Sequence, residues 1–222
     1  MKSYELIIFD WDGTLMDSEN KIVRCFEKSA AEVGIDYPGD DAVRNIIGLG
    51  LKEALDVLLP DEDQSIRDQL VERYRVHFLE KDTTEMPLFE GVESGLDALL
   101  EYGYTLAIAT GKARRGLARV LDETGLHDHF SVTRCSDEAV SKPHPRMVYD
   151  ILNETGVDAG SAIVVGDTVY DIQMAHNAAA DALAVSYGVH EEERLLAEKP
   201  VDCVGDFAGV IRWFGSSTKL TD

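Results

Sequence analysis

The chain has 222 residues, of which 45% are hydrophobic and 8% aromatic, enough for a substantial core and too many for a mainly disordered protein. Asp and Glu total 42 against 21 Lys and Arg, so the formal net charge is −21, and we expect no nucleic acid and no anionic membrane as partner. No apolar run has the length of a signal-peptide core or a membrane span, and the three cysteines form no CxxC pair. We therefore expect a cytoplasmic protein without a disulfide framework.

Short apolar runs that lack polar alternation predict strands buried on both faces. Helical patterns lie between them, and Gly103, Gly125 and Gly156 follow three of these helices, where a left-handed cap is expected. The alternation predicts an α/β fold with a doubly wound, Rossmann-like parallel sheet. The predicted strands are 6–9, 106–109, 162–165 and 182–185, and the predicted helices are 90–102, 114–124, 145–155 and 169–179.

The stretch between the first strand and the next helix has a different pattern. It shows helical periods at 18–33, 51–59 and 65–80 and no convincing strand. We interpret it as an all-helical cap domain, residues 15–87, inserted into a core domain of residues 1–14 and 88–222.

Candidate catalytic residues follow the predicted strands. Ligands of such sheets bind at the carboxyl ends of the strands, and those ends carry Asp10, Thr110 and Asp167. Asp10 and Asp12 flank one residue in a turn, so they can share a divalent cation, or one can attack while the other carries protons. The plain alternative is an acidic turn that caps a helix.

Further charged residues complete this set. Asp171 lies one helical turn beyond Asp167, and four clustered carboxylates require a counter-charge. Asp10, Asp12, Asp167 and Asp171 therefore predict a Mg²⁺ site, with Lys142 as a second counter-charge. For Lys142 alone the alternative is a solvated loop lysine, and for Asp167 and Asp171 it is acids that complement a helix dipole.

The segment Thr110-Gly111-Lys112 stands at a strand end just before a predicted helix. A hydroxyl beside backbone N–H groups at a helix start suits a phosphate, but Thr is equally an ordinary N-cap.

The set Asp10-x-Asp12-Gly-Thr, Thr110, Lys142 and Gly166-Asp167-x-x-x-Asp171 resembles the haloacid dehalogenase superfamily in order and spacing, over nearly the whole chain. The helical insertion resembles that superfamily's helical cap of the first type. Residues 12–18 (Asp-Gly-Thr-Leu-x-Asp-Ser) and 166–172 (Gly-Asp-Thr-x-x-Asp-Ile), together with Lys-Pro-x-Pro at Lys142, are most similar to the phosphoglycolate phosphatases and related phosphatases of small metabolites.

The resemblance implies a role for each matching position. Asp10 would attack phosphorus and form an aspartyl-phosphate, and Asp12 would protonate the leaving alcohol and then activate water. Mg²⁺ would be held by Asp10, the backbone carbonyl of Asp12 and Asp167. Asp171 would bind Mg²⁺ through water or orient Lys142. Thr110 and Lys142 would bind phosphoryl oxygens. The resemblance also disfavours dehalogenation, because dehalogenases of this superfamily lack an aspartate at the position of Asp12.

The predicted cap carries a glycine-bearing loop, Gly48-Leu49-Gly50, that resembles the loop such caps lower over the active site. Arg44 and Lys52 flank it and either meet an anionic leaving group or are surface charges.

These features predict a Mg²⁺-dependent phosphatase of a small phosphorylated metabolite, acting as a monomer or small homo-oligomer. Two alternatives stay open: a sugar phosphomutase of the beta-phosphoglucomutase type, and a catalytically idle interaction protein.

Overall fold

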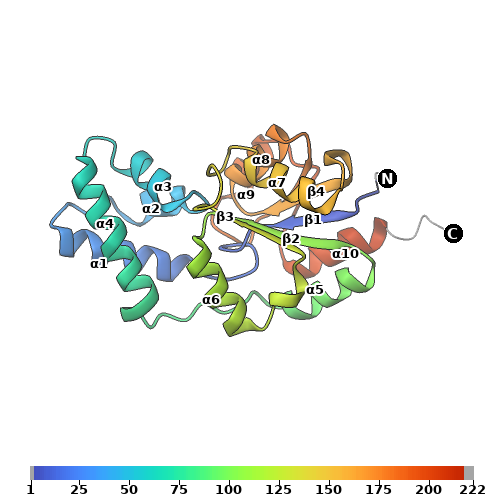
Figure 1. Ribbon diagram of the computed structural model, residues 1–222, viewed down its shortest axis with the longest axis horizontal. Coiled ribbons are helices and arrows are strands. Elements are labelled where there is room, and N and C mark those ends of the chain that lie inside the picture. Colours follow the sequence, from blue (N-terminus) through green and yellow to red (C-terminus); the bar gives the residue numbers. More distant parts are fainter. Residues whose placement is uncertain (1–2, 218–222) are drawn as a thin grey trace.

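Over residues 3–217, the part of the chain that the computed structural model describes, six strands form one sheet in the order β3-β2-β1-β4-β5-β6 (Figure 1). All neighbouring strands are parallel. The strands are β1 (Leu6–Phe9), β2 (Thr105–Thr110), β3 (Val132–Cys135), β4 (Ala162–Gly166), β5 (Asp181–Val185) and β6 (Asp202–Val204).

The register of the central strands brings the predicted catalytic positions to one edge. Phe9 of β1 pairs with Ile108 of β2 and with Val165 of β4, so the three strands end side by side. Asp10 and Asp167 follow these ends directly, and Thr110 is the last residue of β2.

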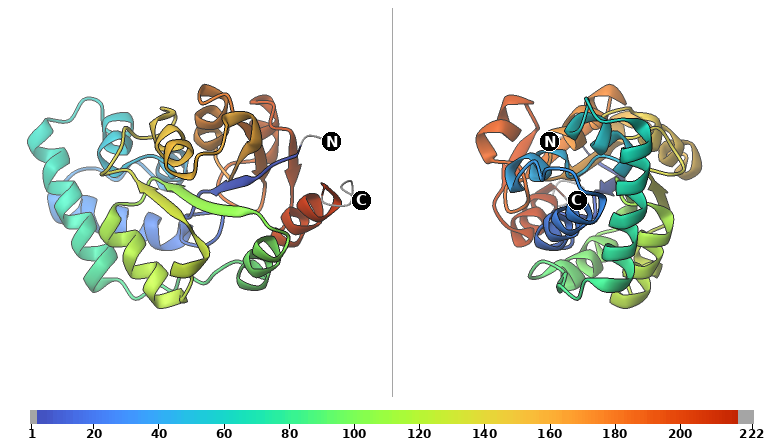
Figure 2. Two further views of the ribbon diagram at one scale, coloured as in Figure 1. Left: turned by 45° about the vertical axis from the view of Figure 1, so that its right-hand side comes forward. Right: turned by 90° about the vertical axis from the view of Figure 1, so that its left-hand side faces the viewer.

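Helices cover both faces of the sheet, as the apolar strands require (Figures 1 and 2). Ile7 and Phe9 of β1 point into one apolar cluster, whereas Leu6 and Ile8 point into the other. The first cluster is closed by α5 (Val92–Glu101), α6 (Arg114–Thr124) and α10 (Phe207–Ser217), and the second by α7 (Arg146–Thr155), α8 (Val169–Asn177) and α9 (Glu192–Ala197).

A separate lobe of helices lies beyond the carboxyl ends of the strands, on the left in Figure 1. It has its own apolar core around Phe26, Leu55 and Leu70. This helical lobe consists of α1 (Glu19–Val33), α2 (Asp40–Ile46), α3 (Leu51–Leu58), α4 (Gln64–Val76) and the π-helical turn η1 (His77–Lys81).

The chain enters and leaves the helical lobe at adjacent points. The backbone N–H of Asp17 donates to the carbonyl of Pro87 at 2.8 Å, and that of Phe89 donates to the carbonyl of Leu15 at 3.0 Å. The two connections thus run side by side between the lobe and the sheet.

The predicted parallel α/β fold is confirmed, as are the four predicted strands and seven predicted helices, to within a few residues at their ends. Gly103, Gly125 and Gly156 adopt the predicted positive φ. The strands β3 and β6 and the helices α2 and α9 were not predicted from the sequence. These are short elements of three to seven residues, and β3 and β6 carry polar residues because they lie at the sheet edges. No helix within residues 3–217 combines the length and apolar character of a membrane span.

Candidate active site

Three buried aspartates meet at the carboxyl edge of the sheet. Asp10 follows β1, Asp167 follows β4, and Asp171 lies in the first turn of α8. Each side chain offers an oxygen, and these oxygens all lie within 4.8 Å of one another. Three carboxylates at this separation repel strongly unless positive charge lies among them.

Asp10 is held in place without a hydrogen bond to its carboxylate. Its backbone N–H donates to the carbonyl of Val165 at 2.9 Å. Lys142 Nζ lies 2.8 Å from Asp10 Oδ1, an ion-pair distance without hydrogen-bond angles, so neither carboxylate oxygen has a hydrogen-bond donor among the described residues. Burial raises the pKa of Asp10 to about 7, although the charge of Lys142 works in the opposite direction. Lys142 is therefore the one charged partner of this carboxylate among the described residues.

Asp167 is fixed more firmly. Its Oδ1 accepts a hydrogen bond from Thr14 Oγ1 at 2.7 Å, and its Oδ2 accepts one from the backbone N–H of Val189 at 2.9 Å. Burial, with the charges of Asp171 and Asp10, raises the pKa of Asp167 well above its usual range. A Cβ on Gly13 would lie 2.2 Å from Asp167 Oδ2, and Gly13 has a φ of +81°, so only glycine fits this turn.

Asp171 has two roles: it stabilises the start of α8, and it carries a negative charge beside Lys142. Its Oδ2 accepts hydrogen bonds from the backbone N–H and the hydroxyl of Thr168, which caps the start of α8. Its Oδ1 accepts a 2.7 Å hydrogen bond from Lys142 Nζ. Burial alone would lower the pKa of Lys142, but the charges of Asp10 and Asp171 outweigh it and raise that pKa. The lysine is therefore a cation fixed between two of the three aspartates.

The carboxylate of Asp12 does not join the other three. It points elsewhere in the site, where its Oδ1 accepts a 2.7 Å hydrogen bond from Ser18 Oγ and lies 2.9 Å from Lys112 Nζ. From the sequence, Lys112 was part of the candidate phosphate-binding segment Thr110-Gly111-Lys112 but not a predicted site residue, and Ser18 was not predicted to contact Asp12. The position of Lys112 directly after Thr110 and Gly111 is the only feature of the sequence that pointed to its place in the site.

Thr110 and Gly111 lie at the same edge. Thr110 is fully buried, and its Oγ1 accepts a hydrogen bond from the backbone N–H of Lys112 at 3.1 Å, which leaves the hydroxyl proton free to point toward a ligand. Helix α6 begins only at Arg114, with Ala113 at its N-cap, so Thr110 is not the cap of that helix.

The loop Gly48-Leu49-Gly50 of the helical lobe rests on these core loops. A Cβ on Gly111 would lie 2.5 Å from the carbonyl oxygen of Leu49, and the backbone N–H of Gly50 donates to Ser141 Oγ at 2.7 Å. A Cβ on Gly48 would lie 3.0 Å from Thr168 Oγ1. The loop thus contacts neighbours of Thr110, Lys142 and Asp167 at once.

The two cations that flank this loop lie in different places. Arg44 pairs with Glu19 at 2.6 Å and with Asp41 at 3.0 Å on the helical lobe, and it does not line the cavity above the aspartates. Lys52 does line that cavity. The structure therefore brings Lys52 toward the site and leaves Arg44 in a surface ion-pair cluster.

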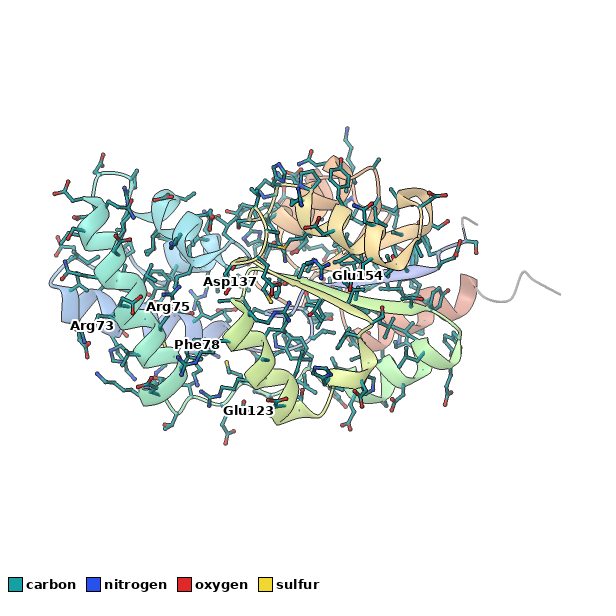
Figure 3. All side chains as sticks on the ribbon, viewed as in Figure 1. Arg73, Arg75, Phe78, Glu123, Asp137 and Glu154 are labelled. Atoms are coloured by element: carbon teal, nitrogen blue, oxygen red, sulfur yellow. The ribbon has the colours of Figure 1, made fainter. Side chains whose placement is uncertain are left out.

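A cavity of about 680 Å³ lies between the helical lobe and the core. Its lining includes Asp10, Asp12, Thr110, Gly111 and Lys112. Figure 3 labels Arg75 and Phe78 on its lobe side and Asp137 on its core side. The site therefore opens into a partly open cavity large enough for a substrate.

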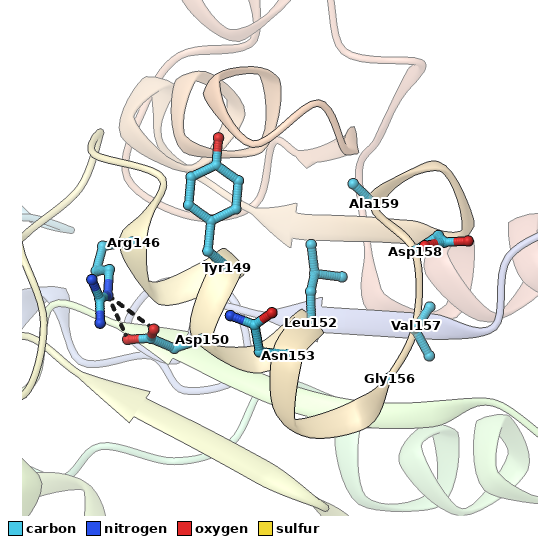
Figure 4. Close-up of a pocket in the computed structure, with 9 residues that line it drawn as sticks. All are labelled: Arg146, Tyr149, Asp150, Leu152, Asn153, Gly156, Val157, Asp158 and Ala159. Carbon is cyan, nitrogen blue, oxygen red and sulfur yellow. Dashed lines mark hydrogen bonds and ion pairs between the residues drawn. The ribbon is translucent and has the colours of Figure 1, made fainter.

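A second hollow of about 660 Å³ lies on the outer side of α7 (Figure 4). Two of its charged side chains, Arg146 and Asp150, pair with each other at 2.9 Å, and a third, Asp158, is exposed. None of the three clustered aspartates lines it, so it is separate from the site.

The donor set at the sheet edge suits Mg²⁺. The ion prefers carboxylate oxygens, and Asp10 supplies two buried oxygens without a hydrogen-bond donor, beside oxygens of Asp167 and Asp171. The residues therefore fit the metal that their pattern predicts.

Comparison with known proteins agrees with this geometry. Residues 7–185 match the family model described as haloacid dehalogenase-like hydrolase. The chain is 35% identical over 211 residues to a probable phosphatase, IndB, of Dickeya dadantii. This alignment covers 93% of this chain and 91% of that protein. It is 30% identical over 210 residues to a phosphoglycolate phosphatase of Agrobacterium fabrum, with 92% and 90% covered. The crystal structure of a predicted phosphoglycolate phosphatase from Haemophilus somnus superposes with a TM-score of 0.85 over 96% of this chain and 99% of that one, at 24% identity.

Proposed function

The chain belongs to the haloacid dehalogenase-like hydrolases, and we propose that it is a Mg²⁺-dependent phosphatase that hydrolyses a small phosphorylated metabolite through an aspartyl-phosphate on Asp10. The observation that carries the proposal is the Asp10 carboxylate, which lines the cavity and whose Oδ2 has no hydrogen-bond donor among the described residues. A carboxylate nucleophile must face the substrate with an oxygen that no donor occupies.

In the proposed first step, an oxygen of Asp10 attacks phosphorus while the bond from phosphorus to the leaving oxygen breaks. Asp12 gives its proton to that oxygen, so that a neutral alcohol leaves. The two carboxylates are suited to different tasks because only Asp10 belongs to the aspartate cluster, whereas Asp12 is oriented by Ser18.

In the second step, Asp12 takes a proton from water, and the hydroxide attacks phosphorus of the aspartyl-phosphate. Inorganic phosphate leaves, and Asp10 is restored as a carboxylate. Lys142 and the hydroxyl of Thr110 are proposed to hold the phosphoryl oxygens in both steps, since Thr110 lines the cavity and the Lys142 ammonium lies 2.8 Å from Asp10.

Asp10, Asp167, Asp171 and the backbone carbonyl of Asp12 are proposed to hold Mg²⁺, directly or through water. When bound, the ion supplies positive charge against the developing charge of the phosphoryl oxygens. The names of the two relatives, both phosphatases, favour hydrolysis over the phosphomutase reaction.

The test is turnover of para-nitrophenyl phosphate in Mg²⁺ by wild type and by Asp10→Asn. We expect the variant to lose at least about a thousandfold in kcat, a typical cost of removing a nucleophile, with an unchanged circular-dichroism spectrum. Full activity of the variant would exclude the aspartyl-phosphate mechanism. Accumulation of an isomeric sugar phosphate without net phosphate release would indicate the phosphomutase instead.

A further inference from the structure

The cavity extends well beyond the space that a phosphoryl group needs. Asp10, Asp12 and Thr110 lie on its core side together with residues 111–113, 115–116 and 136–137, and its other lining residues belong to the helical lobe. Volumes of 300–1,000 Å³ are typical of sites that enclose a whole ligand. The part next to the lobe must therefore receive the leaving group of the substrate.

Apolar side chains dominate the lobe side of this cavity. They come from α1, from the end of α2 and the loop that follows it, from α3, and from the end of α4 with η1. Among them are Ile22, Ile46, Leu49, Leu51, Tyr74 and Phe78. Such walls gain free energy by removing apolar surface of a ligand from water, and they offer few hydrogen bonds to a sugar or to another polyol.

Aromatic rings form the centre of this wall. The ring of Tyr74 lies 5.2 Å from that of Phe26 and stacks on that of Phe78 at 5.6 Å, so its position is fixed from two sides. Tyr74 is partly exposed and lines the cavity. A rigid, partly exposed ring is a natural contact for a second ring.

The charges of the lining do not favour a second anionic group. Besides Asp10 and Asp12, the cavity is lined by the cations Lys52, Arg75, Lys112 and Arg115 and by the acids Glu53, Glu72, Glu80 and Asp137. The two signs are equal in number. Arg75 already pairs with Glu72 at 2.8 Å, and Lys112 pairs with Asp12 at 2.9 Å. A substrate such as 2-phosphoglycolate carries a carboxylate besides its phosphate, and this lining has no excess positive charge to receive it.

We propose that the substrate is the phosphate monoester of a bulky apolar alcohol, preferably one that carries an aromatic ring, and that Tyr74 contacts that ring. This inference rests on the proposed phosphatase function of the same site. It makes Tyr74 a residue that determines specificity through the leaving group, at a distance from the phosphoryl transfer itself.

The test compares three esters with wild-type enzyme in Mg²⁺: benzyl phosphate, ethyl phosphate and 2-phosphoglycolate. Benzyl and ethyl alcohols are both unactivated leaving groups, so the ratio of their kcat/KM values reports contacts to the ring. We expect benzyl phosphate to exceed each of the other two at least about tenfold.

A kcat/KM for 2-phosphoglycolate equal to or above that for benzyl phosphate would overturn the inference and leave the phosphatase proposal intact. Phosphate release from none of the three esters, nor from para-nitrophenyl phosphate, would instead overturn the phosphatase proposal and the inference with it. The two failures are thus distinguishable.

A matched pair of variants locates the effect. We expect Tyr74→Ala to lower the ratio of kcat/KM for benzyl over ethyl phosphate about tenfold. Tyr149→Ala is the control, because Tyr149 lies in the separate hollow on α7 (Figure 4), and it should keep the wild-type ratio. A Tyr74 variant that folds and keeps the ratio would remove Tyr74 from the proposal, and if it fails to fold, the wild-type comparison still decides the substrate class.

Discussion

Lys142 donates a 2.7 Å hydrogen bond to Asp171, and both side chains are almost completely excluded from solvent. The same ammonium group lies 2.8 Å from Asp10. One lysine thus provides the positive charge that lets the aspartate cluster exist before any metal binds. This arrangement makes the stability of the protein, and not only its activity, depend on the active site.

Replacing that lysine should therefore destabilise the fold. For Lys142→Met without Mg²⁺ at pH 8, we expect a loss of about 3 kcal/mol in the free energy of unfolding, because buried carboxylates lose their partner. Urea denaturation followed by circular dichroism measures it. Lys52→Met, an exposed lysine of the same cavity, is the matched control and should change little. An unchanged urea midpoint for Lys142→Met would contradict the electrostatic account.

The pH dependence should identify Asp10 as a destabilising charge in the metal-free protein. Its pKa is raised to about 7 in the fold against an ordinary value of 3.8, so the folded state binds a proton more tightly than the unfolded state. The resulting stabilisation is complete below pH 3.8 and is lost as the pH rises through 7. Relative to Asp10→Asn, the wild type should lose about 2–3 kcal/mol between pH 5 and pH 8. Urea titrations in EDTA test this, and parallel pH profiles would disprove it.

Magnesium should stabilise the fold through the same carboxylates. At a concentration about 100 times its Kd, a ligand adds about 2.7 kcal/mol, which corresponds to a rise in Tm of about 5–10 °C for a chain of this size. We expect Asp167→Asn to lose most of this rise. Asp158→Asn is the control, because Asp158 is exposed in the hollow of Figure 4. Differential scanning calorimetry with and without Mg²⁺ gives the result, and an equal rise in the Asp167 variant would rule out its part in the metal site.

A methyl group on Gly111 should disrupt the contact between the core loop that carries Gly111 and the Gly48-Leu49-Gly50 loop of the helical lobe. The added Cβ would lie 2.5 Å from the carbonyl oxygen of Leu49 and 2.6 Å from that of Gly48, and backbone atoms cannot move aside cheaply. We expect Gly111→Ala to lower kcat/KM at least about tenfold, because a displaced lobe positions the substrate poorly. Gly160→Ala, whose added Cβ meets nothing within 4 Å, is the control for the same substitution. Equal kcat/KM values in the two variants would show that this contact is dispensable.

Much of the fold could be predicted from the sequence because its central strands are unambiguous. Leu6–Phe9 and Ala162–Gly166 are buried on both faces, so they contain no polar residue that would disguise them. Val132–Cys135 and Asp202–Val204 lie at the sheet edges, where Arg134 is partly exposed and Asp202 is exposed, and such strands lack a distinctive pattern.

The site residues that follow the ends of strands could be predicted from the sequence. Asp10, Asp167 and Asp171 were expected together, and parallel strands brought them together. Contacts that depend on the helical lobe were not predictable, since no local pattern shows that Arg44 turns to Glu19 while Lys52 lines the cavity. The ion pair of Lys112 with Asp12 likewise depends on the path of a loop and not on residue spacing.

The adjacent entry and exit of the helical lobe bear on how substrate specificity evolves. Because backbone hydrogen bonds join Asp17 to Pro87 and Phe89 to Leu15, the two ends of the inserted lobe meet at one point of the core. A lobe of different shape could be exchanged there while β1, β4 and their aspartates keep their places. If the lobe selects the substrate as proposed, substrate choice changes with the inserted segment, whereas the proposed chemistry stays with the aspartates at the sheet edge.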